Sequence, residues 1–385
     1  MTAVRKYLYL LQLEEYETKR YFRWLEQNKI DDLEERKSKL KKTPRLLLIL
    51  IISRPLSLFL GDGRAIGLAN NLLSPFCTLG VSILVFLAKI KLLFCPRLVK
   101  IVVTGSYGKT TFKEMLYGVL SSKYLVLKTE GNVNTLPGIA FTLLKKLNPR
   151  HQVLIVEAGA YDEGEIRKIC RLINPSIGVI TIVGLMHLER FGDIENIRRA
   201  KFEIAEFIKD KKKFFAPQKN HQFIDFVETI VRIGQILEID KNQILSKLKK
   251  FKAPQHRLSV KVINPNLIIL DDTYNSNPLG FKRALSKLKK FKNHQKIVVT
   301  PGMIELGQMQ KKLNQEAAKD IAQIADVLVI VGRTNKEALL TAKSLKPRLK
   351  VLTLDKDEAV EDKIMPFLKL PAVILWENDL PDHYF

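Results

Sequence analysis

The chain has 385 residues, a formal net charge of +24 and 46% hydrophobic residues, enough length and apolar content for two folded domains. The charge is compatible with nucleic acid, anionic lipid or phosphorylated substrates, but the basic runs Lys209–Lys213 and Lys247–Lys252 lack the interleaved aromatic residues of a nucleic-acid stacking platform. The three cysteines, Cys77, Cys95 and Cys170, have no paired spacing, which argues against a disulfide framework or zinc site and fits a reducing compartment.

The N-terminal quarter combines a charged segment with apolar ones. Residues 1–45 are charged and compatible with helix, and the first apolar run arrives too late for a secretory signal. Leu46–Leu60 is strongly apolar but contains Arg54 and Pro55, whereas Leu72–Phe94 is long enough to span a bilayer.

We interpret residues 46–97 as a membrane hairpin, with a buried helical hairpin of a soluble domain as the alternative. Basic residues before Leu46 and after Ala88 place both flanks in the cytoplasm, with Gly61–Asn71 as the outer loop. The sequence leaves open whether residues 46–60 span the membrane or form a re-entrant segment.

From residue 98 the pattern alternates between strands and helices, which predicts parallel sheets with crossover helices. We expect a central α/β domain over 98–252 and a C-terminal, Rossmann-like α/β domain over 253–385, with Ala253-Pro254 as the linker. The expected strands are Leu98–Val103, Tyr124–Leu127, Val153–Val156 and Ile177–Val183, then Leu267–Leu270, Lys296–Thr300, Val327–Val331, Lys350–Leu354 and Ala372–Trp376.

A phosphate-binding loop follows the first of these strands. Glycines let backbone N–H groups approach phosphate oxygens, a following helix N-terminus adds partial positive charge, and a Lys-Thr pair supplies a cation and a Mg²⁺-binding hydroxyl. The usual glycine five residues before Gly108 is replaced by Val103, so the loop is a short variant. Its residues are Gly105, Ser106, Tyr107, Gly108, Lys109, Thr110 and Thr111.

Two further strand ends carry polar residues that suit a metal site. Glu157 ends one predicted strand and His187 follows another, and such ends meet at one edge of a parallel sheet. A carboxylate and an imidazole beside a Lys-Thr loop could hold Mg²⁺ directly or through water. In the C-terminal domain, the segment Asp271–Pro278 carries more polar side chains than a turn or helix cap requires.

These motifs, taken together, resemble the Mur ligases, and most closely the D-alanyl-D-alanine-adding MurF type. The likeness covers roughly residues 98–345 and is specific because the motifs occur together in the family's order. They are Thr104–Thr111, Glu157-Ala158-Gly159, His187 to Lys201 followed by Phe202-Glu203-Ile204, His256-Arg257-Leu258 and Asp271–Pro278, with support from Gly131–Asn134 and Thr300–Gly307.

The resemblance implies a P-loop central domain and an ATP- and Mg²⁺-dependent ligase that forms an amide through an acyl phosphate. Lys109 and the loop Gly105–Gly108 would bind phosphates, while Thr110 and Glu157 would hold one Mg²⁺ and His187 a second. Lys201 matches the lysine that family members carbamylate into an anionic metal-site ligand. Arg257 would stabilise the transferring phosphate, and the residues expected to meet the nucleotide or the amine substrate are Asp271, Asp272, Tyr274 and Asn275.

Three departures from the MurF pattern limit what the resemblance carries over. The charged segment and apolar hairpin stand where the family's uridine-nucleotide-binding domain would be. The interval after Lys201 is short, with Gln222 where an asparagine usually approaches adenine, so the adenine pocket is altered or reduced. The tail Trp376–Asp382 lacks the family's Lys-Gly-Ser run.

We therefore predict a ligase at the cytoplasmic face of the membrane, joining the carboxylate of a nucleotide- or lipid-linked peptidoglycan precursor to a D-Ala-D-Ala-like amine. The alternative is a non-catalytic, membrane-anchored nucleotide-binding scaffold. Another Mur-like ligase, such as a polyglutamate-adding enzyme, is a third option that Asp271–Pro278 disfavours. The oligomeric state does not follow from the sequence.

Overall fold

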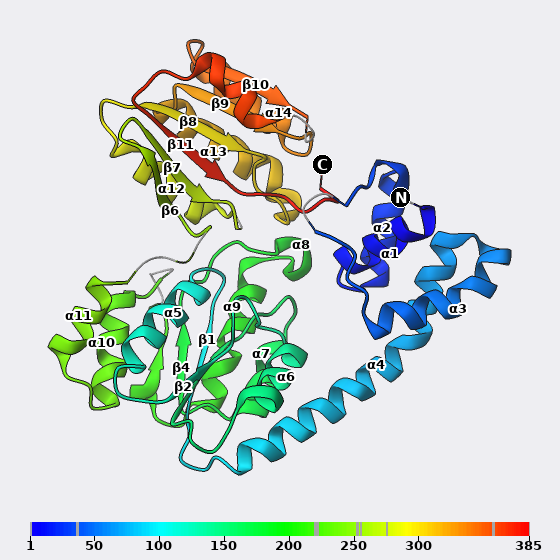
Figure 1. Cartoon of the computed structure of the whole chain (residues 1–385), viewed down its shortest axis with the longest axis vertical. Helices are drawn as coiled ribbons and strands as arrows, with labels where there is room; N and C mark the ends of the chain where they lie inside the picture. Colours follow the sequence, from blue (N-terminus) through cyan, green and yellow to red (C-terminus); the bar gives the residue numbers. More distant parts are fainter. Residues whose placement is uncertain are drawn as a thin grey trace. The chain divides into compact units, whose positions relative to one another are not determined.

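The computed structural model describes residues 2–35, 38–218, 223–251, 254, 256–274, 276–355 and 359–384. By contacts, the chain divides into two compact units, Met1–Ile83 with Asp379–Phe385, and Leu84–Asn378 (Figure 1). Three positions singled out in the sequence, Gln222, Ala253 and Asn275, lie outside the described residues.

The first unit is helical. It contains α1 (Ala3–Leu13), α2 (Thr18–Gln27), the short 3-10 helix η1 (Ile30–Asp32), α3 (Pro44–Leu60) and most of α4 (Asp62–Leu93). Thr43 caps α3 because its Oγ1 accepts from the Leu46 N–H at 3.2 Å. The core of this unit is formed by side chains from all four α-helices, among them Tyr9, Tyr21, Ile49, Ile66 and Ala69.

The two apolar segments are therefore helices, joined at Gly61. The expected outer loop Gly61–Asn71 is wrong, because α4 begins at Asp62 and continues without a break to Leu93. By length and composition α4 could cross a membrane: an 18-residue window has a mean hydropathy of 2.0, and only 11% of it is buried.

In the first half of the second unit, α-helices pack against both faces of a five-stranded sheet. Its strand order is β2-β3-β1-β4-β5, and every pairing is parallel. Figure 1 shows α5, α10 and α11 on one side of this sheet and α6 and α7 on the other. The strands are β1 (Val99–Thr104), β2 (Val126–Lys128), β3 (Val153–Glu157), β4 (Ile177–Ile180) and β5 (Phe214–Phe215). The helices are α5 (Lys109–Leu120), α6 (Leu136–Lys146), α7 (Glu165–Ile173), α8 (Leu188–Phe191), α9 (Ile194–Phe202), α10 (Phe226–Ile236) and α11 (Lys241–Lys249), with the 3-10 helices η2 (Glu203–Phe207) and η3 (Lys211–Lys213).

The second half contains a six-stranded sheet of order β10-β9-β8-β11-β7-β6, parallel except for the antiparallel pair β6 and β7. Its strands are β6 (Ser259–Asn264), β7 (Leu267–Asp272), β8 (Gln295–Thr300), β9 (Val327–Val331), β10 (Lys350–Leu354) and β11 (Ala372–Glu377). Its helices are α12 (Pro278–Lys289), α13 (Gln310–Ile324), α14 (Lys336–Leu345) and α15 (Val360–Ile364), with the 3-10 helices η4 (Gly307–Met309) and η5 (Met365–Phe367).

The predicted fold class is confirmed, since both sheets alternate with helices as the pattern of apolar runs indicates. Two edge strands were missed. β5 has only two residues, too short to produce a periodic signal, and β6 is a mostly exposed edge strand with little apolar content to bury.

Candidate active site

The phosphate-binding loop joins β1 to α5, as the sequence indicates. Gly105 and Gly108 have positive φ angles of 139° and 76°, which L-residues with a side chain rarely adopt. A Cβ added at Gly105 would lie 2.3 Å from Thr181 Oγ1, so this position also lacks the room for one. The loop is held against the chain after β4, because the Ser106 N–H donates to the Ile182 carbonyl at 2.6 Å.

Lys109, the first residue of α5, is folded onto the loop. Its Nζ donates to the Gly105 carbonyl at 2.8 Å and to the Ser106 carbonyl at 3.2 Å. The pKa of Lys109 is lowered to about 8, chiefly by burial and also by the charge of Arg257, while the charge of Glu157 acts to raise it. A phosphate in the loop would supply the negative charge that this buried ammonium lacks.

Thr110 and Glu157 form the part of the site that fits a magnesium ion. The Thr110 hydroxyl donates to Glu157 Oε1 at 3.2 Å, so two hard oxygen atoms from β3 and α5 lie together, the donor type that Mg²⁺ prefers. The other carboxylate oxygen, Oε2, accepts from Lys113 Nζ at 3.0 Å in a buried ion pair. Thr111 lies beside Thr110 in the first turn of α5.

Lys201 is buried on α9, and its Nζ donates to the Ala160 carbonyl at 3.0 Å. Its pKa is lowered to about 7, chiefly by burial and also by the charge of Lys109, while the charges of Glu165 and Glu203 act to raise it. A lysine with this pKa is largely neutral just above pH 7, and the neutral amine is the form that reacts as a nucleophile.

His187 lies just before α8, with a left-handed backbone at φ 53°. Its Nδ1 contacts the Glu305 carboxylate from the loop after β8, and its ring stands edge-on to Tyr161 at 4.6 Å between centroids. Within the described ranges, no group of three or more His, Cys, Asp or Glu side chains is placed to hold a metal ion.

Arg257 brings the C-terminal half of the unit to the phosphate loop. Its Nη2 donates to Thr110 Oγ1 at 3.3 Å, and its guanidinium lies 3.7 Å from the centroid of the Tyr274 ring. A cation from one domain thus reaches the helix that begins at the phosphate loop of the other, as the resemblance implies for Arg257.

Asp271 and Asp272 end β7 in different surroundings. Burial acts to raise the pKa of Asp271, but hydrogen bonds from Lys261, Thr273 and His256 outweigh it and lower the pKa to about 2. Burial raises the pKa of Asp272 to about 6. Glu377 faces Asp272 in the register of β11 and β7, and burial together with the Asp272 charge raises the pKa of Glu377.

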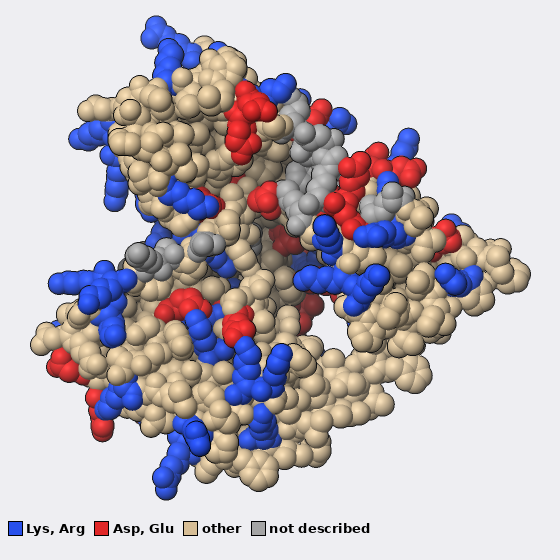
Figure 2. All heavy atoms as spheres, in the orientation of Figure 1, with Lys and Arg blue, Asp and Glu red and all other residues tan. Residues whose placement is uncertain are grey.

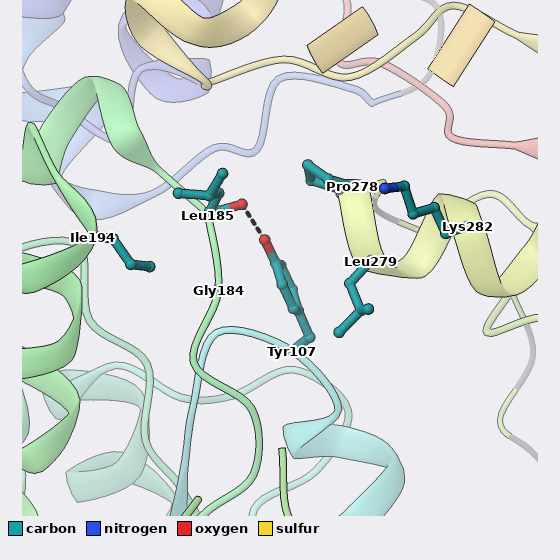
Figure 3. Close-up of a pocket in the computed structure, with 7 residues that line it drawn as sticks. All are labelled: Tyr107, Gly184, Leu185, Ile194, Pro278, Leu279 and Lys282. Carbon is teal, nitrogen blue, oxygen red and sulfur yellow. Dashed lines mark hydrogen bonds between the residues drawn. The ribbon is translucent and has the colours of Figure 1, made fainter. Parts of the chain in front are cut away.

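A pocket of about 360 Å³ lies beside the loop. Figure 3 shows the Tyr107 ring directed into it, with the hydroxyl hydrogen-bonded to the Leu185 carbonyl. Lys282 and the start of α12 line the opposite side. The lining residues are Tyr107, Gly184, Leu185, Ile194, Pro278, Leu279 and Lys282. Tyr107 is thus part of a pocket wall as well as of the phosphate loop.

Sequence reasoning missed three charged partners in this site: Lys113 beside Glu157, Glu305 beside His187 and Glu377 beside Asp272. Lys113 could have been found from its spacing, since it follows Lys109 by one helical turn and so shares its face of α5. Glu305 and Glu377 end up beside their partners through pairing of distant segments, which no local pattern reveals.

Comparison with known proteins agrees with this arrangement. The profile described as "Mur ligase middle domain" matches residues 103–269, and the profile "Mur ligase, glutamate ligase domain" matches residues 256–376. The UDP-N-acetylmuramoyl-tripeptide--D-alanyl-D-alanine ligase of Bacillus subtilis is 26% identical over 272 residues, 57% of this chain and 59% of the relative. The corresponding ligase of Escherichia coli is 38% identical over 104 residues, 27% of this chain and 23% of the relative.

Solved structures share the fold. MurF from Acinetobacter baumannii has a TM-score of 0.66 at 23% identity, covering 77% of each chain. MurF ligase from Thermotoga maritima in complex with ADP has a TM-score of 0.66 at 23% identity, covering 78% of this chain and 80% of that one. The chain spans about 59% of the length of the Bacillus relative. Because the middle-domain and glutamate-ligase-domain profiles match this chain in order and together cover residues 103–376, the chain belongs to the Mur ligase family.

Proposed function

We propose that this protein is an ATP- and Mg²⁺-dependent ligase of the MurF type that joins a carboxylate of a peptidoglycan precursor to an amine. One observation carries the proposal: Lys109 and the Thr110–Glu157 pair stand at the phosphate loop, and Arg257 contacts Thr110 from the C-terminal half. Support also comes from the relatives, which are named as UDP-N-acetylmuramoyl-tripeptide--D-alanyl-D-alanine ligases.

The proposed reaction has two steps, formation of an acyl phosphate and then of the amide. A carboxylate oxygen of the precursor attacks the γ-phosphorus of ATP, the bond to the β-phosphate oxygen breaks, and ADP leaves. The amine nitrogen then attacks the carbonyl carbon of the acyl phosphate, inorganic phosphate leaves, and the nitrogen loses one proton. Crowded anions must be held together throughout, so positioning and charge stabilisation are the main work of the protein.

The residues of this chain suit that work. Lys109 and the loop N–H groups would bind the outer phosphates, and Arg257 would stabilise the charge on the transferring group. Thr110 and Glu157 would hold Mg²⁺, which when bound would neutralise phosphate charge. His187 would bind a second ion. The residues proposed to contact the nucleotide or the amine are Asp271, Asp272, Tyr274 and Asn275.

Lys201 is proposed to carry a carbamate. The neutral amine would attack dissolved CO₂, forming an N–C bond and releasing one proton, which changes a buried neutral amine into an anion. The lowered pKa of Lys201 favours this step by supplying neutral amine near pH 7. Lys201→Ala should lose activity, and a short added carboxylate such as acetate should restore part of it; full activity without rescue would contradict the carbamate.

Phosphate release by the purified full chain tests the ligase proposal. The precursor would be UDP-MurNAc-tripeptide in one arm and a lipid-linked analogue in another, each with and without D-Ala-D-Ala. We expect release that requires both the precursor and the amine, and loss of it in Lys109→Met. ATP binding without stimulation by any pair of acceptors would reject the proposal in favour of a nucleotide-binding scaffold.

We propose further that the protein works at the cytoplasmic face of the cell membrane, held there by α3 and α4. The length and apolar composition of α4 and its low burial support this location. The domain limits 1–45, 46–97, 98–252 and 253–385 also remain a proposal.

A further inference from the structure

The helical unit presents large apolar side chains to the outside on both α3 and α4. Leu58 and Phe59, at the end of α3, are 82% and 87% exposed. On Figure 2 the surface over α3 and the middle of α4 is mostly formed by residues other than Lys, Arg, Asp and Glu. We call the following exposed set the apolar face: Leu47, Leu48, Ile51, Leu58, Phe59, Leu72, Phe76, Leu79 and Ile83.

The part of the apolar face that lies on α4 occupies one of three sides of this helix. One side is packed into hydrophobic clusters and includes Leu73, Cys77, Leu84 and Ala88. A second side carries small polar residues and a lysine, namely Asn71, Ser74, Thr78, Ser82 and Lys89. The exposed apolar residues follow every three or four positions, at Leu72, Phe76, Leu79, Ile83, Phe86 and Ile90. A helix with separate packed, polar and apolar sides is suited to lying along an interface.

Charged helices cover the N-terminal part of α4, which limits how it can insert. The Tyr21 hydroxyl of α2 donates to the Gly63 carbonyl at 2.9 Å, and the Asn70 amide donates to the Tyr16 carbonyl at 2.8 Å. A hairpin inserted across the bilayer with its tip at Gly61 would carry α1 and α2 into the hydrocarbon. These helices hold Arg5, Lys6, Lys19, Arg20 and Arg23, and burying such charges in lipid is costly.

The C-terminal tail excludes a crossing by α4 alone. Tyr9 of α1 donates its hydroxyl to Asp382 Oδ2 at 2.6 Å, and Trp24 Nε1 of α2 donates to the His383 carbonyl at 2.9 Å. Asn378 belongs to the second unit and Asp379 to the first. If α4 spanned a hydrocarbon core of about 30 Å, the peptide bond between these two residues would have to cross it as well.

We propose that the apolar face enters a single leaflet of an anionic membrane from one side, with both ends of α4 remaining on that side. The inference rests on the membrane location proposed above and decides how the protein is held there. Exposed basic residues accompany the face, at Arg54, Arg64 and Lys89. They would attract anionic headgroups, whereas against the same face of a second copy they would repel one another.

The topology can be tested in cells that express the full chain. Cys77, Cys95 and Cys170 are replaced by serine, and Arg64→Cys or Lys89→Cys supplies one exposed thiol. A membrane-impermeant maleimide should label neither site in intact cells and both sites in inside-out vesicles. Labelling of Arg64→Cys from outside would show that the hairpin or α4 spans the membrane, and would overturn the one-sided mode while leaving the membrane location standing.

Binding of the purified chain to lipid vesicles tests the face itself. Phosphatidylcholine vesicles with phosphatidylglycerol should retain the protein better than vesicles without it. The double variant Phe59→Glu/Phe76→Glu should weaken binding at least about tenfold, while Leu345→Glu, at an exposed apolar site on α14, should not. Absence of vesicle binding would overturn both the location and the face. A change from dimer to monomer in the double variant with unchanged vesicle binding would assign the face to a second copy and reject the proposal. Phosphate release by the same variants reports on the ligase proposal separately.

Discussion

At the scale of single residues, the site is distinguished by three lysines, of which Lys113 and Lys201 are buried and Lys109 is partly buried. Lys109 lies on the phosphate loop, Lys113 pairs with Glu157, and Lys201 on α9 donates to the Ala160 carbonyl in the loop after β3. A buried ammonium is costly unless an anion compensates it. Lys113 has such a partner within the chain, whereas Lys109 and Lys201 have lowered pKa values, which supports the proposed phosphate binding by Lys109 and carbamylation of Lys201.

Lys201 should make the stability of the protein depend on pH. Its pKa is lowered from 10.5 to about 7, so between these values the unfolded chain binds a proton that the folded chain has lost. The free energy of unfolding therefore rises with pH in this window, by up to about 1.4 kcal/mol per pH unit from this group, and the full cost of the buried charge is present below pH 7. The free energy of unfolding, measured with urea between pH 7 and 10, should rise less steeply with pH in Lys201→Met than in Lys249→Met, a control at an exposed lysine. Equal slopes would contradict the prediction.

Lys113→Met should destabilise the fold strongly because it leaves the Glu157 carboxylate buried without its cation. The expected loss is about 3–5 kcal/mol, measured by urea unfolding. The double variant Lys113→Met/Glu157→Gln should recover much of this loss, since it removes the charge as well as its partner. If the stability lost in the double variant equals the sum of the losses in Lys113→Met and Glu157→Gln, the two side chains do not interact.

At the scale of elements, the connection between β1 and α5 depends on backbone geometry that only glycine adopts easily. Gly105 combines a positive φ with a close approach to Thr181 and the Ile182 backbone. The close approach attaches the loop to the chain after β4 and thereby sets where a phosphate could lie.

Gly105→Ala should therefore lower stability by about 1–3 kcal/mol and weaken nucleotide binding, because the loop must shift to admit the Cβ. Gly118→Ala is a matched control: it lies within α5, a Cβ there meets nothing within 4 Å, and alanine should stabilise the helix by up to about 1 kcal/mol. Thermal unfolding and titration with ATP measure both effects. Unchanged ATP affinity in Gly105→Ala would show that the loop does not bind phosphate.

At the scale of the whole molecule, both ends of the chain belong to the helical unit. Residues 379–384 pack among α1 and α2, with Leu380 and Asp382 buried. The last strand of the C-terminal sheet is thus followed at once by a segment of the N-terminal unit, which α4 connects to the central sheet. The helical unit is therefore tied by the backbone to both α/β domains.

Removal of residues 380–385 should destabilise the helical unit. Burial of Leu380 alone is worth about 1.5–3 kcal/mol, and Trp24 loses its acceptor at His383. In a Trp376→Phe background, Trp24 is the remaining tryptophan of the chain and reports on this unit. Its emission should shift to longer wavelength and its urea midpoint should fall after truncation. An unchanged midpoint relative to full-length Trp376→Phe would indicate that the tail is not part of the unit's core.

Local patterns in the sequence determined much of the α/β architecture and the phosphate-loop chemistry. The nine expected strands are present because buried parallel strands need continuous apolar runs, and the Gly-Lys-Thr loop lies between β1 and α5 because each of these has its own local signal. What belongs to one segment, such as the polar residues at the carboxyl end of a strand, could therefore be predicted.

Only the tertiary structure decided which charges meet. Glu305 contacts His187 across 118 positions of sequence, Glu377 faces Asp272 through strand register, and the tail packs on α1 some 370 residues away. It also decided that Asp62–Asn71 is helix, because those residues pack against Tyr7, Tyr21 and Phe22 and are not in a loop. Such contacts depend on the packing of distant segments, whose energies are absent from any local window of sequence.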